Sequence, residues 1–101
     1  MPYLIQAIDH KGVDTKREEL RLAHREHLKS AGQKLLASGA LLSDDGATIV
    51  GGVSVLDTED RAEAERFANE DPYTLHKIRK EIQIIRWRRR WVDGLFLGDI
   101  A

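Results

Sequence analysis

The sequence predicts an α+β domain of the ferredoxin-like type, with its elements in the order β-α-β-β-α-β. Three observations predict this class: apolar, partly β-branched strand runs near both ends, a helical apolar stripe in each half, and an Asp-Gly turn between two central strands. In this arrangement a four-stranded antiparallel sheet carries two helices on one face. The apolar residues of the other face need a cover, which predicts a homodimer packed sheet against sheet.

The first half of the chain predicts a strand followed by a long helix. Residues 3–8 are short, apolar and partly β-branched, which is typical of a strand. Residues 16–38 predict the helix, because positions on one face recur every three or four residues. These positions are Leu20, His24, Leu28, Ala31 and Leu35. Gly32 predicts a kink or close packing in mid-helix, and Gly39 predicts a left-handed cap at its end.

A hairpin and a second helix follow. Residues 40–43 and 49–56 predict two strands joined at Asp45-Gly46, a dipeptide typical of tight turns. Gly51-Gly52 predicts a bulge or a close backbone approach in the second strand. Asp57-Thr58 predicts the cap of a helix whose apolar face ends at Asp71.

The end of the chain predicts a short helix and a last strand. Residues 73–77 form the short helix, because Asp71 before Pro72 is a common helix start. Residues 81–92 predict the last strand. Residues 1–92 then make up the domain, and residues 93–101 form an apolar C-terminal tail.

Composition limits the classes of function. The chain has 101 residues, a net charge of −1 and no cysteine, which argues against a general nucleic-acid binder and excludes disulfides and thiolate chemistry. No apolar run reaches the roughly 20 residues that cross a bilayer. Residues 1–10 lack the basic region of a signal peptide, so we expect a cytoplasmic protein without membrane association.

Charge is unevenly distributed. Residues 78–91 hold six basic residues and one acid, so this segment carries +5 and the rest of the chain −6. One interpretation is a basic strand that faces acidic helices, within one chain or across a dimer. The other is the anion-attracting wall of a pocket.

His24 and Asp71 are the candidate catalytic residues. His24 lies on the apolar face of the first helix, where it is either a packed histidine or a general acid or base. Asp71 either caps the short helix through Tyr73 or orients His24, as the acid does in hydrolytic triads. The two roles of Asp71 are compatible if its two carboxylate oxygens divide them.

Metal and cofactor motifs do not occur in the sequence. His27 follows His24 at helical spacing, but no third ligand is near in sequence and no HExxH spacing occurs. No glycine-rich phosphate loop or nucleophile elbow is present either. We therefore expect no metal and no cofactor.

Several short motifs carry a resemblance to a known family. Arg21-Leu22-Ala23-His24, the stretch from Ala37 to Gly46, Asp71-Pro72-Tyr73 and Ile85-Arg86-Trp87 follow one another in the family's order and spacing. Over residues 3–91 the chain resembles the YciI-like (YCII-related domain) family. It departs from the family pattern at three positions. Ala40 and Arg86 stand where relatives have proline, and Lys77 stands where many have glycine.

The resemblance implies a ferredoxin-like fold, association as a dimeric α/β barrel, and a pocket centred on His24 and Asp71. Arg21 matches the family arginine. A few relatives are similar to dehydrochlorinases that act on chlorinated hydroxyhydroquinones. We therefore expect a cofactor-independent, lyase-like enzyme for a small phenolic or anionic substrate, with Arg21 attracting its charge and Tyr73 at the pocket rim.

Two other functions stay open at this point. One is a non-catalytic small-ligand-binding or accessory homodimer, in which the pair holds a metabolite or joins the two helices. The other is nucleic-acid binding on the sheet, which is disfavoured because the expected strands offer aliphatic residues and glycines instead of stacking aromatics.

Overall fold

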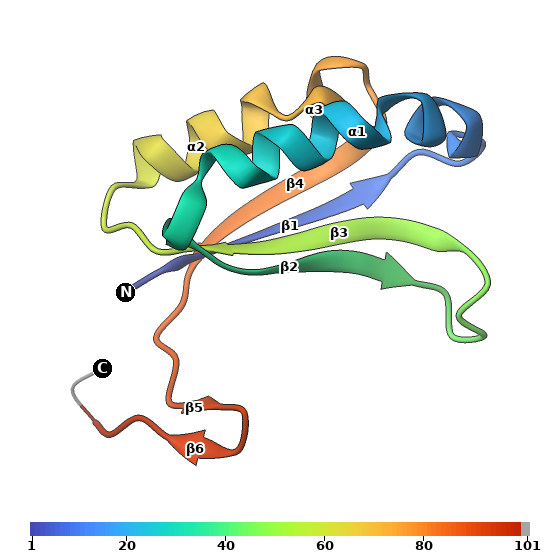
Figure 1. Cartoon of the computed structure of the whole chain (residues 1–101). Helices are drawn as coiled ribbons and strands as arrows, with labels where there is room; N and C mark the ends of the chain where they lie inside the picture. Colours follow the sequence, from blue (N-terminus) through green and yellow to red (C-terminus); the bar gives the residue numbers. More distant parts are fainter. Residues whose placement is uncertain (100–101) are drawn as a thin grey trace.

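The computed structural model describes residues 1–99 and confirms the α+β class. Four strands form an antiparallel sheet in the order β2-β3-β1-β4, and three helices lie together on one face of it (Figure 1). The elements are β1 (Tyr3–Asp9), α1 (Asp14–Ser30), the 3-10 turn η1 (Gly32–Lys34), β2 (Leu35–Leu42), β3 (Ile49–Leu56), α2 (Arg61–Glu70), α3 (Pro72–Leu75), β4 (Arg79–Arg86), β5 (Trp91–Val92) and β6 (Leu95–Phe96). No helix within residues 1–99 combines the length and the apolar character needed to span a bilayer.

The core lies between the sheet and the helices. Along β1, every second side chain is buried, starting at Tyr3 and ending at Asp9. Tyr3 and Ile5 pack with Leu56 of β3 and with the small residues Ala64 and Ala68 of α2. Full burial of one large apolar side chain contributes about 1.5–3 kcal/mol, so this cluster fixes α2 over β1.

Gly51 and Gly52 mark a close approach, as predicted. A Cβ at Gly51 would lie 2.0 Å from the carbonyl oxygen of Ala7 on the neighbouring strand. A Cβ at Gly52 would lie 3.0 Å from the guanidinium of Arg79. The backbone of β1 therefore requires glycine at the first position, whereas a side chain at the second would press on the Arg79 guanidinium.

The predicted end of the first helix is wrong. The helix stops at Ser30 and not at residue 38, because Gly32 takes a left-handed φ of 59°. Residues 35–42 are the edge strand β2, which pairs with β3 in the sheet. Gly39 lies within this strand and caps no helix. Leu35 continues the helical spacing only by coincidence, since strand pairing overrides it.

The helix caps and the last strand also differ from the prediction. Asp60, and not Asp57-Thr58, caps α2 by accepting a hydrogen bond from the Ala62 N–H. β4 ends at Arg86, opposite Tyr3, where its partner strand β1 begins.

Residues 91–96 form a separate hairpin, which lies away from the sheet on the side opposite the helices (Figure 1). Its turn is Asp93-Gly94, where both residues have positive φ, as a tight hairpin turn requires. This Asp-Gly signal is of the kind that predicted the central hairpin. Residues 100–101 of the predicted tail lie outside the described part of the chain.

Candidate functional site

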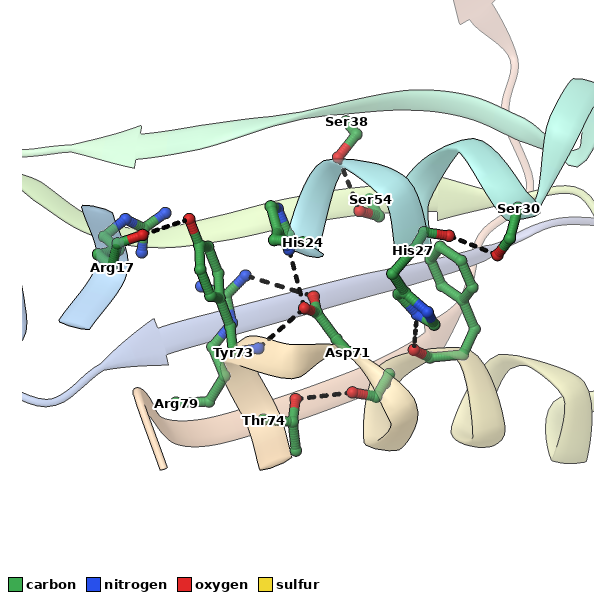
Figure 2. Close-up of polar contacts among 12 residues, drawn as sticks. Arg17, His24, His27, Ser30, Ser38, Ser54, Asp71, Tyr73, Thr74 and Arg79 are labelled. Atoms are coloured by element: carbon green, nitrogen blue, oxygen red, sulfur yellow. Dashed lines mark hydrogen bonds and ion pairs between the residues drawn. The ribbon is translucent and has the colours of Figure 1, made fainter. Parts of the chain in front are cut away.

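The structure brings His24 and Asp71 into contact. His24 projects from α1, and Asp71 lies at the junction of α2 and α3. Figure 2 shows the two side chains joined, with His24 Nδ1 2.8 Å from Asp71 Oδ1. The side chains are 16% and 11% exposed, so water screens this contact only weakly.

Asp71 performs its two roles with one oxygen. Oδ1 accepts the hydrogen bond from His24 and also the Tyr73 N–H at 3.0 Å, which caps α3. The two roles therefore do not require separate oxygens. The reason is geometric: the cap points Oδ1 along the start of α3, and the His24 ring lies on that side. Oδ2 faces Arg79 instead, with Nη2 4.0 Å away.

The charge state of Asp71 defines the tautomer of His24. Burial acts to raise the pKa of Asp71, but hydrogen bonds from His24 and the Tyr73 N–H, with the positive charge of Arg79, hold that pKa below its ordinary value. Asp71 is then a carboxylate at neutral pH and can only accept hydrogen bonds. His24 must donate from Nδ1, which leaves the lone pair of a neutral imidazole on Nε2. Within residues 1–99, no protein group hydrogen-bonds Nε2.

Tyr73 lies beneath the His24 ring and is not at the rim. The two rings stack with centroids 4.0 Å apart and planes 8° apart, and Tyr73 is only 3% exposed. Its hydroxyl donates to the carbonyl oxygen of Arg17 at 3.2 Å. Burial raises the pKa of Tyr73, so the phenol stays neutral and acts as a platform for the imidazole. Tyr73 is buried because it packs in a cluster with Val13 and Ile78.

An open cleft of about 640 Å³ adjoins the pair. One wall is α1, with Arg21 and His24, and the other is formed by β2 and β3, where Ser38 and Ser54 share a hydrogen bond (Figure 2). Arg21 is half-exposed and pairs with Glu18 at 3.2 Å, one turn before His24. A cleft of this volume holds a small organic molecule.

Sequence reasoning missed three buried charges beside the pair. Asp9 accepts from Arg79 Nη1 at 2.8 Å and from Arg17 Nη1. A signal for Asp9 existed, because it continues the alternation that buries the inward face of β1. Arg17 lies two helical turns before His24 and so shares its face of α1. No local signal separates Arg79 from the other basic residues of its segment.

His27 joins two helices. Its Nε2–H donates to the carbonyl oxygen of Phe67 in α2 at 2.7 Å, and the two rings stack at 4.6 Å. This contact holds α1 against α2 and gives the second histidine of the helix a structural role. Residues 1–99 contain no cluster of three side chains arranged to bind a metal ion.

Comparison with solved structures finds a protein of similar fold. The protein is similar to 5-chloro-2-hydroxyhydroquinone dehydrochlorinase from Burkholderia phenoliruptrix AC1100, solved in complex with 2,5-dihydroxybenzoquinone. The TM-score is 0.80 and the sequence identity 24%, covering 87% of this chain and 94% of that chain.

Other comparisons are weaker. Two structures of a hypothetical protein from Arabidopsis thaliana match with TM-scores of 0.46 and 0.49. Their sequence identities are 12% and 15%, each match covers 91% of this chain, and 97% and 89% of the other chains are covered. None of the curated proteins compared with the chain matches it. The profile of the YCII-related domain matches residues 1–88, and the chain therefore belongs to the YCII-related domain family.

Proposed function

We propose that the protein is a cofactor-independent enzyme for a small phenolic or anionic molecule, with His24 as general acid/base and Asp71 as the group that orients it. One observation carries this proposal: the Asp71 carboxylate accepts a hydrogen bond from the His24 Nδ1–H, which leaves the Nε2 lone pair free beside a cleft of about 640 Å³. A positioned group of this kind typically contributes about 10²–10⁴-fold in rate.

The reaction class that fits is elimination, as in removal of HCl from a chlorinated ring. His24 Nε2 takes a proton from the substrate, the electron pair left behind forms a new double bond, and chloride leaves. The balance needs no oxidant and no cofactor. Asp71 stabilises the imidazolium formed in this step. Support for this class comes from the similar fold of the dehydrochlorinase.

Two arginines on the α1 wall of the cleft can bind a negatively charged substrate. Arg21 and Arg25 lie one turn apart on α1, and both line the cleft with His24. Cations at this wall attract a phenolate or carboxylate before proton transfer. Tyr73 supports the imidazole from below and has its hydroxyl occupied by the Arg17 carbonyl.

The test is chloride release from chlorinated hydroxyhydroquinones and a panel of small phenols, followed by ion chromatography. We expect His24→Ala to lower kcat/KM by about 10²–10⁴-fold, with unchanged circular dichroism. His10→Ala is the matched control, because His10 is exposed, does not line the cleft and does not contact His24 or Asp71. Equal activity in His24→Ala would overturn the proposal, and ligand binding without turnover would favour a non-catalytic binding protein.

The proposal extends to a ferredoxin-like homodimer that packs through the open sheet face, of the dimeric α/β-barrel type. It is supported by the strand order and by the position of all three helices on one face. Ile85 on the other face is 47% exposed. A cytoplasmic location is part of the same proposal, on the ground of the cysteine-free sequence. Nucleic-acid binding has no part in it.

A further inference from the structure

Arg79 is a buried cation beside the candidate catalytic pair. Its side chain is 8% exposed, and Nη1 donates to Asp9 Oδ1 at 2.8 Å. Nη2 lies 4.0 Å from Asp71 Oδ2, and the guanidinium carbon lies 5.2 Å from the centre of the Tyr73 ring. One side chain therefore reaches both groups that touch His24: the carboxylate bonded to its Nδ1 and the ring stacked beneath it (Figure 2).

The neighbouring strand leaves space for this guanidinium. A Cβ at Gly52 would lie 3.0 Å from Nη2 and 3.3 Å from Nη1 of Arg79. Gly52 has no positive φ, so its backbone does not require glycine. Because glycine has no side chain, this position leaves room for the guanidinium of Arg79.

Arg79 faces the carboxylate oxygen that the pair leaves unused. Asp71 Oδ1 already accepts two hydrogen bonds, whereas Oδ2 accepts none from residues 1–99. The positive charge of Arg79 therefore lies next to this oxygen and offsets its negative charge. Asp9 holds Arg79 in place, because its own carboxylate is almost fully buried and is also bonded to Arg17.

The charges around His24 nearly cancel when the ring is neutral. The charged and titratable groups packed around the pair, or on the adjoining turns of α1, are Arg17, Glu18, Arg21 and Arg25 of α1, Asp9 of β1, Asp71, Tyr73 of α3 and Arg79 of β4. In the buried group, Asp9 and Asp71 balance Arg17 and Arg79. Removal of Arg79 would leave one negative charge in excess, which favours the imidazolium form of His24.

We propose that Arg79, seated in the space left by Gly52 and held by Asp9, is a positioning residue that holds the Asp71 carboxylate and the Tyr73 ring against His24 and offsets the negative charge beside the imidazole. The proposal rests on the acid/base role of His24. Arg79 acts on that role through Asp71 and Tyr73.

The test is an NMR titration of the His24 ring against pH, which needs no substrate. We expect Arg79→Gln to raise the midpoint of the His24 titration by about half a pH unit or more. In Arg79→Lys, which keeps the positive charge, we expect a midpoint close to that of the wild type. We also expect faster solvent exchange of the downfield Nδ1–H signal in Arg79→Gln. A midpoint and an exchange rate equal to those of the wild type would overturn the proposal.

Arg86→Gln is the matched control. Arg86 lies on the same strand, its guanidinium is 5.1 Å from the Tyr3 ring, and Nη2 donates to the Tyr3 hydroxyl at 2.7 Å. It thus repeats the relation of Arg79 to Tyr73 at a distance from the pair. If Arg86→Gln moved the midpoint of the His24 titration as far as Arg79→Gln does, the effect would come from net charge or overall stability and not from the position of Arg79. That result would also overturn the proposal.

A second pair of variants tests the position of Arg79 without removing its charge. Gly52→Ala displaces the guanidinium, and we expect it to move the His24 midpoint in the same direction by a smaller amount. Gly39→Ala on β2 is its control, because a Cβ there meets nothing within 4 Å. If neither Gly52→Ala nor Arg79→Gln moves the titration, Arg79 is not a positioning residue. If the wild type releases no chloride but Arg79→Gln raises the His24 midpoint as expected, only the proposed function is contradicted.

Discussion

Asp71 shows how one side chain connects local structure to candidate chemistry. The same oxygen caps a four-residue helix and accepts the hydrogen bond from the His24 Nδ1–H. The cap orients the carboxylate, and the oriented carboxylate selects the tautomer of the imidazole. The Asp-Pro-Tyr sequence thus builds the acceptor, the helix start and the aromatic platform from three consecutive residues.

The stability of the protein depends on the ionised form of Asp71. Its folded pKa is below the ordinary value of about 3.9, so its stabilisation is complete above that value and is lost as pH falls through the lower folded pKa. We expect Asp71→Asn to lower the free energy of unfolding by about 1–3 kcal/mol at pH 7. Urea unfolding at pH 7 and at about pH 3 measures this, and the difference from the wild type should shrink at the lower pH. A difference that does not depend on pH would show that the charge of Asp71 contributes nothing to stability.

At the scale of elements, α3 ends in a strained residue. Lys77 has a φ of 61°, in the left-handed region that favours glycine. Lysine here accepts a backbone conformation that costs about 1–2 kcal/mol in a residue with a Cβ.

Replacement of this lysine should stabilise the protein. We expect Lys77→Gly to raise the free energy of unfolding by about 0.5–1 kcal/mol, since relief of strain exceeds the entropy that glycine loses on folding. Thermal unfolding followed by circular dichroism measures the gain as a higher Tm. Lys80→Gly, in the extended strand β4, is the control and should lower the Tm. A lower Tm in both variants would contradict strain at Lys77.

At the scale of the whole molecule, the sheet has two unequal faces. The helices cover one face, and residues on the other alternate with the core residues of each strand. The hairpin of residues 91–96 lies on this second side and exposes Trp91 and Phe96, whose rings contact each other at 5.0 Å. A two-stranded hairpin is only marginally stable in isolation, and this one leaves Trp91 and Leu95 63% and 67% exposed.

The proposed homodimer makes a prediction about this face. We expect Ile85→Glu to yield a monomer in sedimentation velocity, because Ile85 lies on the open face and a buried, unpaired carboxylate there is costly. Leu22→Glu is the control, since Leu22 is 70% exposed on α1 and should leave the dimer unchanged. A wild-type protein that sediments as a monomer would contradict the homodimer.

Much of the architecture could be predicted from local patterns. The period of two in residues 3–8, the period of 3.6 in the first helix, the Asp-Gly turn and the Asp-Pro-Tyr start each depend on neighbouring residues alone. The prediction failed where a local pattern has two meanings. Leu35 continued a helical stripe, but Gly32 had already ended the helix and β3 offered a pairing edge.

The sequence by itself determined the α+β class, the family and the two residues worth testing, because these are written in short motifs and periodicities. The folded chain decided the rest: which oxygen of Asp71 meets His24, that Tyr73 lies beneath the imidazole, and that Arg79 is buried beside both. These contacts join residues far apart in the chain. They depend on strand register and helix docking, which arise only when the whole core is packed, and no single segment encodes them.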